Sequence, residues 1–399
     1  MTPAQRITLE ILFALARSAG VLDTEAADVT LAEVQQEAVE AAYAPRITAE
    51  LRGSASPGTL VRLPGTDAFV NAQKDVHGLS AQGRYGLMVT AEQPLFDFGR
   101  TSLRREAAER AHQAALDGVS AARAELHKTL ASLFFVWSAR VAVAEAAEDD
   151  LAAASAAAAR SRRRIAEGNL SGSAQTLVDV EADRAAMAAA KARAAADEAR
   201  VALERLLGPL PAGAVPDPTV TPTVPSPHDR QGDAVLLALR ARHAAALAEA
   251  RAAAAATRPV VGAAASLGVR GVDDHMFPAW DVGLGLTAPL WDASTSATTH
   301  AARAKALRLE AQIAREERDA VARARAAQAA LPSAEARVEL AEALLAHAAH
   351  AASDMEKRDT AGEATADERE KAQAELRRAR LERRLAAIDV ARALFEARP

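Results

Sequence analysis

Two histidines in a predicted helix have the spacing that a metal site could use. His347 and His350 lie three residues apart, so a helix projects both imidazoles from one side. A protein zinc site needs at least three protein ligands, and no third ligand lies nearby in the sequence. Surface histidines are therefore the favoured interpretation, and no metal or other cofactor is predicted.

Other short motifs give no sign of catalysis. Gly168 and Gly172 do not form a phosphate-binding loop, because no strand precedes them and no Lys-Ser/Thr pair follows. The sequon Asn169-Leu170-Ser171 is best explained by chance. The sequence shows no nucleophile beside a base and no convincing pair of catalytic carboxylates. We therefore do not expect an enzyme.

Composition favours long, closely packed helices over a thick core. Half of the 399 residues are apolar, only 3% are aromatic, and alanine supplies most of the apolar share. Alanine favours helix but buries little area. The net charge of −5 gives no reason to expect a nucleic-acid partner. With no cysteine, disulfides and thiolate metal sites are excluded.

Long helical stretches are separated by glycine, serine and proline. One stretch of nearly seventy residues would be about 100 Å long, several times a bilayer core. We found no run of 18 strongly apolar residues and so expect no transmembrane helix. The expected helices are residues 5–44 with a break near 20–23, then 100–167, 174–207, 233–257, 297–358 with a kink at Pro332, and 367–398.

Four segments alternate between apolar and polar or small residues, which predicts strands. They lie at 47–52, 85–92, 261–270 and 280–287, and the first two are joined by an irregular loop over 53–82. Each pair of strands is followed by a Pro-containing turn and a long helix. This order occurs twice, so an internal repeat is predicted.

The repeat defines the expected domain organisation. The first repeat covers residues 1–207, a Pro-rich linker covers 208–230, and the second repeat covers 231–399. Within them we expect two β-hairpins and two long helical hairpins, at 46–97, 100–207, 259–290 and 296–398. The fold class is thus mainly α with β.

The strands cannot form a stable soluble sheet alone. An apolar sheet face of this size in water would be an exposed patch that soluble monomers avoid. In lipid, an open sheet edge is not tolerated, and single-chain bacterial barrels have at least eight strands. Several chains must therefore share one barrel, while the long, polar helical hairpins project into water. Tyr85 and Trp280 would suit a membrane-interface aromatic belt, or would simply pack on the sheet.

Two pairs of motifs and one single motif then make the chain resemble the TolC family of outer membrane efflux proteins. QPLFDFGR (93–100) and APLWDAS (288–294) occupy the strand-to-helix junctions. RIAEGNLSG (164–172) and RDTAGEATAD (358–367) occupy the helical tips, and VALERLLG (201–208) closes the first half. The resemblance implies a homotrimeric, twelve-stranded barrel in outer membrane lipid with a helical periplasmic tunnel. It further implies passive export of small molecules or proteins from an inner-membrane pump through a periplasmic adaptor.

The same resemblance suggests functional positions at the helical tips. Glu368 and Lys371 fall where the family narrows its channel, and opposite charges there imply a mixed-charge aperture that departs from an acidic ring. A solvated helix face is an equally good interpretation. Adaptor contacts would involve residues at both tips: Arg164, Gly168, Leu170, Arg358 and Gly362. The neighbouring Arg162 and Arg163, like Arg164, could contact the adaptor or pair across hairpins, although a solvated face is the favoured interpretation.

Two other classes remain open, a periplasmic adaptor protein and a soluble coiled-coil scaffold. An adaptor usually has one helical hairpin between compact β domains, whereas two hairpins are predicted here. A scaffold would not need four alternating strands. The resemblance places the chain in the outer membrane of a Gram-negative bacterium. No signal peptide is evident, because Glu10 interrupts the apolar stretch 7–16 and we expect a helix there.

Overall fold

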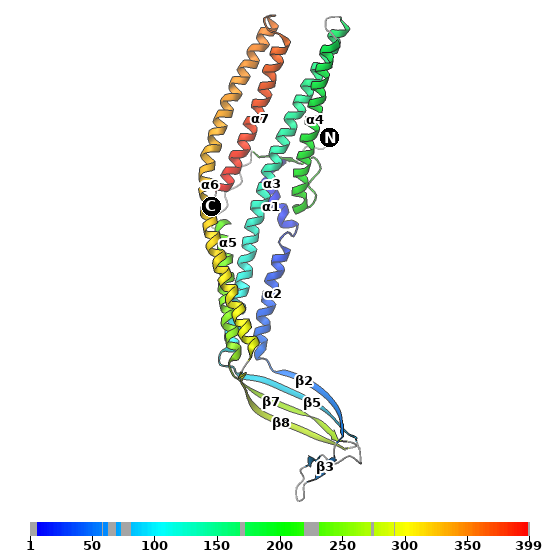
Figure 1. The fold of residues 1–399 in the computed structure, drawn as a ribbon, viewed down its shortest axis with the longest axis vertical. Helices are drawn as coiled ribbons and strands as arrows, with labels where there is room; N and C mark the ends of the chain where they lie inside the picture. The colour runs from blue at the N-terminus through cyan, green and yellow to red at the C-terminus, as the bar shows by residue number, and fades with distance from the viewer. Residues whose placement is uncertain are drawn as a thin grey trace. The chain divides into compact units, whose positions relative to one another are not determined.

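The computed structural model describes residues 6–57, 59–62, 69–72, 81–167, 172–218, 231–272, 275–290 and 292–397 (Figure 1). The chain forms two compact units. The helical unit comprises residues 1–27, 116–238 and 312–399. The sheet unit comprises residues 28–115 and 239–311.

The sheet unit contains one four-stranded antiparallel sheet in the order β2-β5-β7-β8 (Figure 1). The strands are β2 (Arg46–Pro57), β5 (Ala81–Phe96), β7 (Val260–Val272) and β8 (His275–Thr287). All four predicted strands are confirmed, and each is longer than expected. The prediction of an irregular loop over 53–82 is wrong in part. β2 runs to Pro57, and β3 (Thr59–Arg62) pairs with β4 (Phe69–Ala72). These short runs of strand-forming residues were hidden among glycine and proline.

The strand register brings the apolar residues of all four strands to one face. Residues directly opposite each other in an antiparallel pair point to the same side of the sheet. Three cross-strand rows illustrate this: Ile47–Ala91–Ala265–Val282, Ala49–Val89–Leu267–Trp280 and Leu51–Leu87–Val269–Pro278. The alternate rows carry polar or small residues, such as Thr48–Thr90–Ser266–Asp281. The sheet therefore has one apolar and one polar face.

A β-bulge changes this alternation near the end of β5. Pro94 pairs with Gly262, but the next pair is Phe96 with Val261, so Leu95 is the extra residue. Val261 in turn pairs with Leu286 on the apolar face. The bulge thus places Phe96 in the last apolar row before the helices begin.

The helices before the first and third long strands are close to expectation. The first predicted helical stretch divides into α1 (Leu9–Ser18) and α2 (Asp23–Glu40), with Gly20 at φ 65° in the break. The helix before β7 is α5 (Gln231–Ala254). Both α2 and α5 end in a short 3-10 turn, η1 (Ala41–Tyr43) and η2 (Ala255–Thr257), and proline follows in each case.

Four long helices follow the sheet strands. They are α3 (Arg100–Ala166), α4 (Gly172–Leu207), α6 (Ala293–Thr360) and α7 (Ala366–Ala397). Two helical hairpins are thus present, α3 with α4 and α6 with α7 (Figure 1). α6 begins four residues earlier than predicted, and it continues through Pro332 without interruption.

The helical unit is held by one main hydrophobic core. Its largest fully buried side chains include Leu130, Phe134 and Trp137 of α3, Leu12 of α1 and Leu203 of α4. The parallel pairing of β1 (Arg6–Ile7) with β6 (Val215–Pro216), which the sequence did not predict, joins the segment before α1 to the segment after α4.

One part of α3 differs from the sequence expectation about membrane spans. Among the described helices, α3 alone has an 18-residue window that is long and apolar enough to cross a membrane, with mean hydropathy 1.5. The expectation that no such window exists is therefore wrong. However, 44% of the window is buried within the chain. Because α3 also supplies most of the aromatic core residues, we interpret it as a core helix.

Candidate functional site

The apolar face of the sheet is uncovered. Leu51 is 79% exposed, and Trp280 and Leu284 are each 76% exposed. The two outer strands, β2 and β8, each have a sheet partner on one side only within the described part of the chain. A large apolar face and two open edges together are unsuited to a soluble monomer.

The two aromatic residues proposed for a membrane belt lie at different levels of the sheet. Tyr85 pairs with Gly271, which pairs with Met276. Trp280 lies four residues further along β8, about 13 Å nearer the helices. Its ring is exposed on the apolar face, whereas the side chain of Tyr85 lies outside the described part of the structure.

The first strand-to-helix junction is organised by a buried aspartate. Asp97 is 4% exposed, and its carboxylate accepts hydrogen bonds from the backbone N–H groups of Gly99 at 3.1 Å and Thr101 at 2.7 Å. These contacts cap the start of α3. Burial raises the pKa of Asp97, but hydrogen bonds from Thr101, Tyr43 and Gly99 outweigh it and lower the pKa below the ordinary value. Asp97 is therefore a buried carboxylate that stays ionised.

Unusual backbone angles make the first junction a tight turn. Phe98 has a φ of 51° and Gly99 a φ of 82°. The carbonyl oxygen of Phe98 accepts a hydrogen bond from Arg258 Nη1 at 2.8 Å. Arg258 directly follows η2, so this bond connects the start of α3 to the start of β7.

The second junction uses the same residue type in a more open setting. Asp292 accepts hydrogen bonds from the Ser294 backbone N–H at 2.8 Å, the Ser294 hydroxyl at 2.7 Å and the Thr295 hydroxyl at 2.9 Å. These bonds lower the pKa of Asp292. Sequence reasoning noted the two aspartates but missed that both cap helices, which the pattern of Asp followed by Ser or Thr could have indicated.

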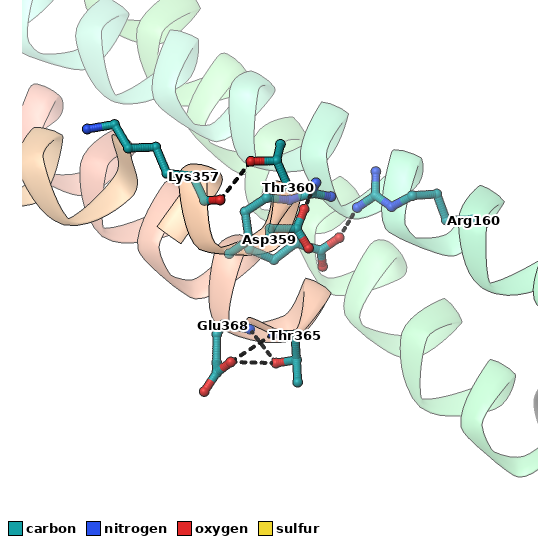
Figure 2. Close-up of polar contacts among 8 residues, drawn as sticks. Arg160, Lys357, Asp359, Thr360, Thr365 and Glu368 are labelled. Atoms are coloured by element: carbon teal, nitrogen blue, oxygen red, sulfur yellow. Dashed lines mark hydrogen bonds and ion pairs between the residues drawn. The ribbon is translucent and has the colours of Figure 1, made fainter. Parts of the chain in front are cut away.

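The turn between α6 and α7 is built from two helix-capping motifs, and Figure 2 shows the one formed by Thr365 and Glu368. At the end of α6, Gly362 has a φ of 76°, the Gly362 N–H donates to the Asp359 carbonyl, and the Glu363 N–H donates to the Arg358 carbonyl. This is a Schellman motif, which explains the glycine. At the start of α7, the Thr365 backbone N–H donates to Glu368 Oε2 at 2.9 Å. The Glu368 N–H donates back to the Thr365 hydroxyl at 3.3 Å, which completes a capping box.

The two aperture candidates are both exposed and both held locally. Bonds from the Thr365 backbone and hydroxyl lower the pKa of Glu368. A mixed-charge aperture would suggest that Lys371 pairs with Glu368, but it does not. Its Nζ lies 2.7 Å from Asp367 Oδ2, and this contact raises the pKa of Lys371. The T-x-x-E spacing of a capping box was visible in the sequence and was missed.

Of the first tip, only the helix ends can be described. Gly168 and Leu170 lie outside the described residues. Arg164 is exposed near the end of α3. Arg162 pairs with Asp179 of α4 at 2.9 Å, so one of the three consecutive arginines bridges the hairpin.

Ion pairs link α3 of one helical hairpin to α7 of the other. Near the tips, Arg160 pairs with Glu370, and Figure 2 shows the side chain of Arg160 close to the α6–α7 turn. Further along, Arg377 Nε lies 2.7 Å from Asp150 Oδ1, and Arg384 pairs with Glu145. The three α7 residues are seven apart, so they lie on one side of the helix.

The histidine pair shows no sign of a metal site. His350 Nδ1 lies 3.2 Å from Asp354 Oδ2 on the same helix, and His347 is exposed. Among the described residues, no group of three or more His, Cys, Asp or Glu could hold a metal ion.

The sequence matches the profile of one protein family over most of its length. The matched residues are 14–209 and 230–396, and the family is described as outer membrane efflux protein. The chain belongs to the outer membrane efflux protein family. The resemblance inferred from the junction and tip motifs is thereby confirmed, and no curated protein matches the sequence.

Solved channel structures share the fold. The Campylobacter jejuni outer membrane channel CmeC aligns with a TM-score of 0.78 at 13% identity, over 98% of this chain and 84% of that one. The Vibrio cholerae outer membrane protein VceC aligns with a TM-score of 0.71 at 19% identity, over 98% of this chain and 94% of that one. The Neisseria gonorrhoeae MtrE channel, solved in its open state, aligns with a TM-score of 0.66 at 18% identity, over 97% of this chain and 88% of that one.

Family membership decides between the classes that the sequence left open. The chain is an outer membrane channel of tripartite efflux systems rather than an enzyme, an adaptor or a soluble scaffold. The mainly helical fold with a four-stranded sheet agrees with this class.

Proposed function

We propose that three copies of this chain close a single twelve-stranded barrel in the outer membrane. The uncovered apolar face of the sheet carries this proposal, because lipid is the environment in which such a face is stable. Four strands per chain are too few for a barrel, and three chains supply twelve. Joining β8 of one copy to β2 of the next would satisfy every open edge.

In this arrangement the polar face lines the channel and the long helices continue it into the periplasm. Cargo moves passively, driven by an inner-membrane pump that is joined through a periplasmic adaptor. The adaptor contacts the helical tips, at Arg164, Gly168, Leu170, Arg358 and Gly362. The capped α6–α7 turn supports a docking role, since its shape is held by its own backbone bonds.

Pairwise cysteine cross-linking tests the assembly, and the absence of native cysteine makes the result clean. Thr48 of β2 and Asp281 of β8 share one row across the sheet. A Thr48→Cys/Asp281→Cys variant, treated in membranes with a short bis-maleimide, should give bands of two and three chains and none larger.

The single variants are the matched controls. In a head-to-tail ring a β2 edge never meets another β2 edge, so Thr48→Cys alone should stay monomeric after treatment. Efficient dimers from that variant, or a ladder beyond three chains from the double variant, would exclude the three-chain ring.

A further inference from the structure

Three arginines surround the turn that leaves the sheet at the end of β5. Arg100 begins α3 and Arg104 lies one turn later. Arg258, in the turn between η2 and β7, donates to the Phe98 carbonyl as described above. Guanidinium groups are thus concentrated around residues 96–99.

The acidic residues near this turn are already engaged. The carboxylate of Asp97 caps α3. Glu106 pairs with Arg251 at 3.2 Å, and Glu40 pairs with Arg105 at 3.3 Å. Within the described residues, no ion pair or hydrogen bond neutralises Arg100 or Arg104.

The folded chain compensates these two arginines only in part. The Nε of Arg100 is buried without a hydrogen-bond partner, a costly state for a charged donor. Both side chains lie at the positive end of the α3 dipole, where acidic residues are favoured, yet the first turn contains none. Burial, followed by the charge of Arg100, lowers the pKa of Arg104, and the charge of Asp97 opposes this shift without reversing it. A bound anion would relieve each of these penalties.

The position of the arginines indicates what kind of anion this is. Phe96 ends the apolar face of the sheet, and the rings of Phe96 and Phe98 meet edge to face at 4.7 Å. These rings are 56% and 46% exposed. Exposed aromatic side chains at the end of a lipid-facing surface are typical of the membrane–water boundary. Arg100 and Arg104 follow this boundary within two turns of helix, at the level of lipid head groups.

We propose that Arg100 and Arg104 bind the phosphate of an anionic phospholipid at the helical end of the barrel, with Phe96 and Phe98 against its acyl chains. This inference rests on the proposed barrel, which puts the apolar face in lipid. Guanidinium groups suit phosphate because their planar N–H pairs match two of its oxygens. A net negative head group is favoured over a zwitterionic one, since neither arginine has an ion pair within the described part of the chain.

Native mass spectrometry of the purified protein in mild detergent tests the proposal. Phosphatidylglycerol and phosphatidylcholine with identical acyl chains are titrated in parallel, and bound lipids and chain number are read from the same spectra. Wild type should prefer phosphatidylglycerol. Arg100→Gln/Arg104→Gln should lose this preference by roughly tenfold or more. Arg110→Gln/Arg308→Gln removes the same charge from exposed sites on α3 and α6 and should retain it.

Three outcomes would overturn the inference. Equal lipid preference in the two double variants would show that general charge is responsible. Displacement of phosphatidylglycerol by inorganic phosphate at matched concentration would identify a free anion as the ligand. Loss of oligomer in Arg100→Gln/Arg104→Gln before lipid is added would mean that the arginines pair with a neighbouring copy. A wrong chain number with intact lipid preference would contradict the proposed trimer alone.

Discussion

Asp97 and Asp292 cap the helices that follow β5 and β8, in very different surroundings. Asp97 is buried and also accepts a hydrogen bond from Tyr43, whose pKa is raised by burial and then by this carboxylate. Asp97→Ala removes the cap and one of the two side-chain hydrogen bonds of the Tyr43 hydroxyl, which keeps its bond with Thr101. We expect this to cost about 1–2 kcal/mol in stability. Asp292→Ala, in the exposed junction, is the matched control and should cost less. Thermal melts in detergent, followed by circular dichroism, compare the two.

The direction of the Asp97 pKa shift also predicts a dependence on pH. Because the pKa is lower in the folded than in the unfolded state, ionised Asp97 stabilises the fold above its ordinary pKa of 3.8. This contribution is lost as the pH falls below 3.8 through the folded-state value. The difference in melting temperature between wild type and Asp97→Ala should therefore be constant near neutral pH and shrink in that acidic range. A constant difference down to the lowest pH would contradict it.

Lys371 tests whether the returning helix α7 lines the channel. Lys371→Asp breaks the pair with Asp367 and would place three further negative charges around a three-fold axis. We expect higher cation selectivity and block by divalent cations in single-channel recordings, since like charges that converge in a pore attract counterions. Lys357→Asp is the matched control, because Lys357 pairs with Asp354 on α6 near the same tip. The same shift in both variants would point to general surface charge instead.

At the level of residues, the sequence indicated which residues matter better than it indicated which residues they pair with. The sequence was sufficient to identify the junction aspartates and the tip glycine Gly362. The role of Glu368 was open between pore and surface, and the capping box with Thr365 adds a structural role that local spacing could have revealed. The pairing of Arg384 with Glu145 could not be predicted, because it depends on how helices far apart in the sequence pack together.

At the scale of the elements, one glycine decides how closely β5 and β7 approach. A Cβ atom on Gly268 would lie 2.0 Å from the Leu87 carbonyl oxygen, a backbone atom that cannot move without breaking the ladder. Gly268→Ala should therefore destabilise the sheet by at least the ~1–3 kcal/mol typical of overpacking. Gly285→Ala is the control, because no atom lies within 4 Å of its Cβ position. The fraction of heat-resistant oligomer on gels should fall in the first variant only.

Element prediction succeeded where the pattern was long and failed where it was short. Helical spacing sustained over tens of residues defined α3 and α6 to within a few residues. The hairpin of β3 and β4 was missed because four-residue strands give too few alternations to stand out. The ends of β2 and β5 were placed too early, since Ser, Gly and Pro near them favour turns locally while strand pairing extends the sheet.

For the molecule as a whole, the two faces of the sheet should tolerate charge very differently. Leu267 and Ser266 are neighbours in β7 but lie in an apolar and a polar row respectively. Leu267→Arg would put a charge into lipid, at about 2–4 kcal/mol near the midplane. Ser266→Arg would face the channel and should assemble normally. Quantifying assembled protein in outer membrane fractions distinguishes them, and equal yields would contradict the assignment of the faces.

The two unlike faces of the sheet and the long helices could be predicted because they follow from alternation and length. Apolar and polar sides of four strands, and helices far longer than a bilayer, restrict the possible architectures to very few. What the sequence did not show was the arginine cluster beside Phe96 and Phe98. It forms only because Arg258, more than 150 residues later, returns to the same turn.

The single extra residue in β5 reverses the alternation by which successive residues of the strand point to the two faces of the sheet. Before Leu95, odd-numbered residues of β5 lie on the apolar face of the sheet, and after it Phe96 lies on that face despite its even number. The residues that follow, including Asp97 at the start of α3, keep this changed alternation. A one-residue deletion at the bulge would therefore change the direction of the side chains throughout the junction. In an exposed connection between elements, the same deletion would be absorbed locally.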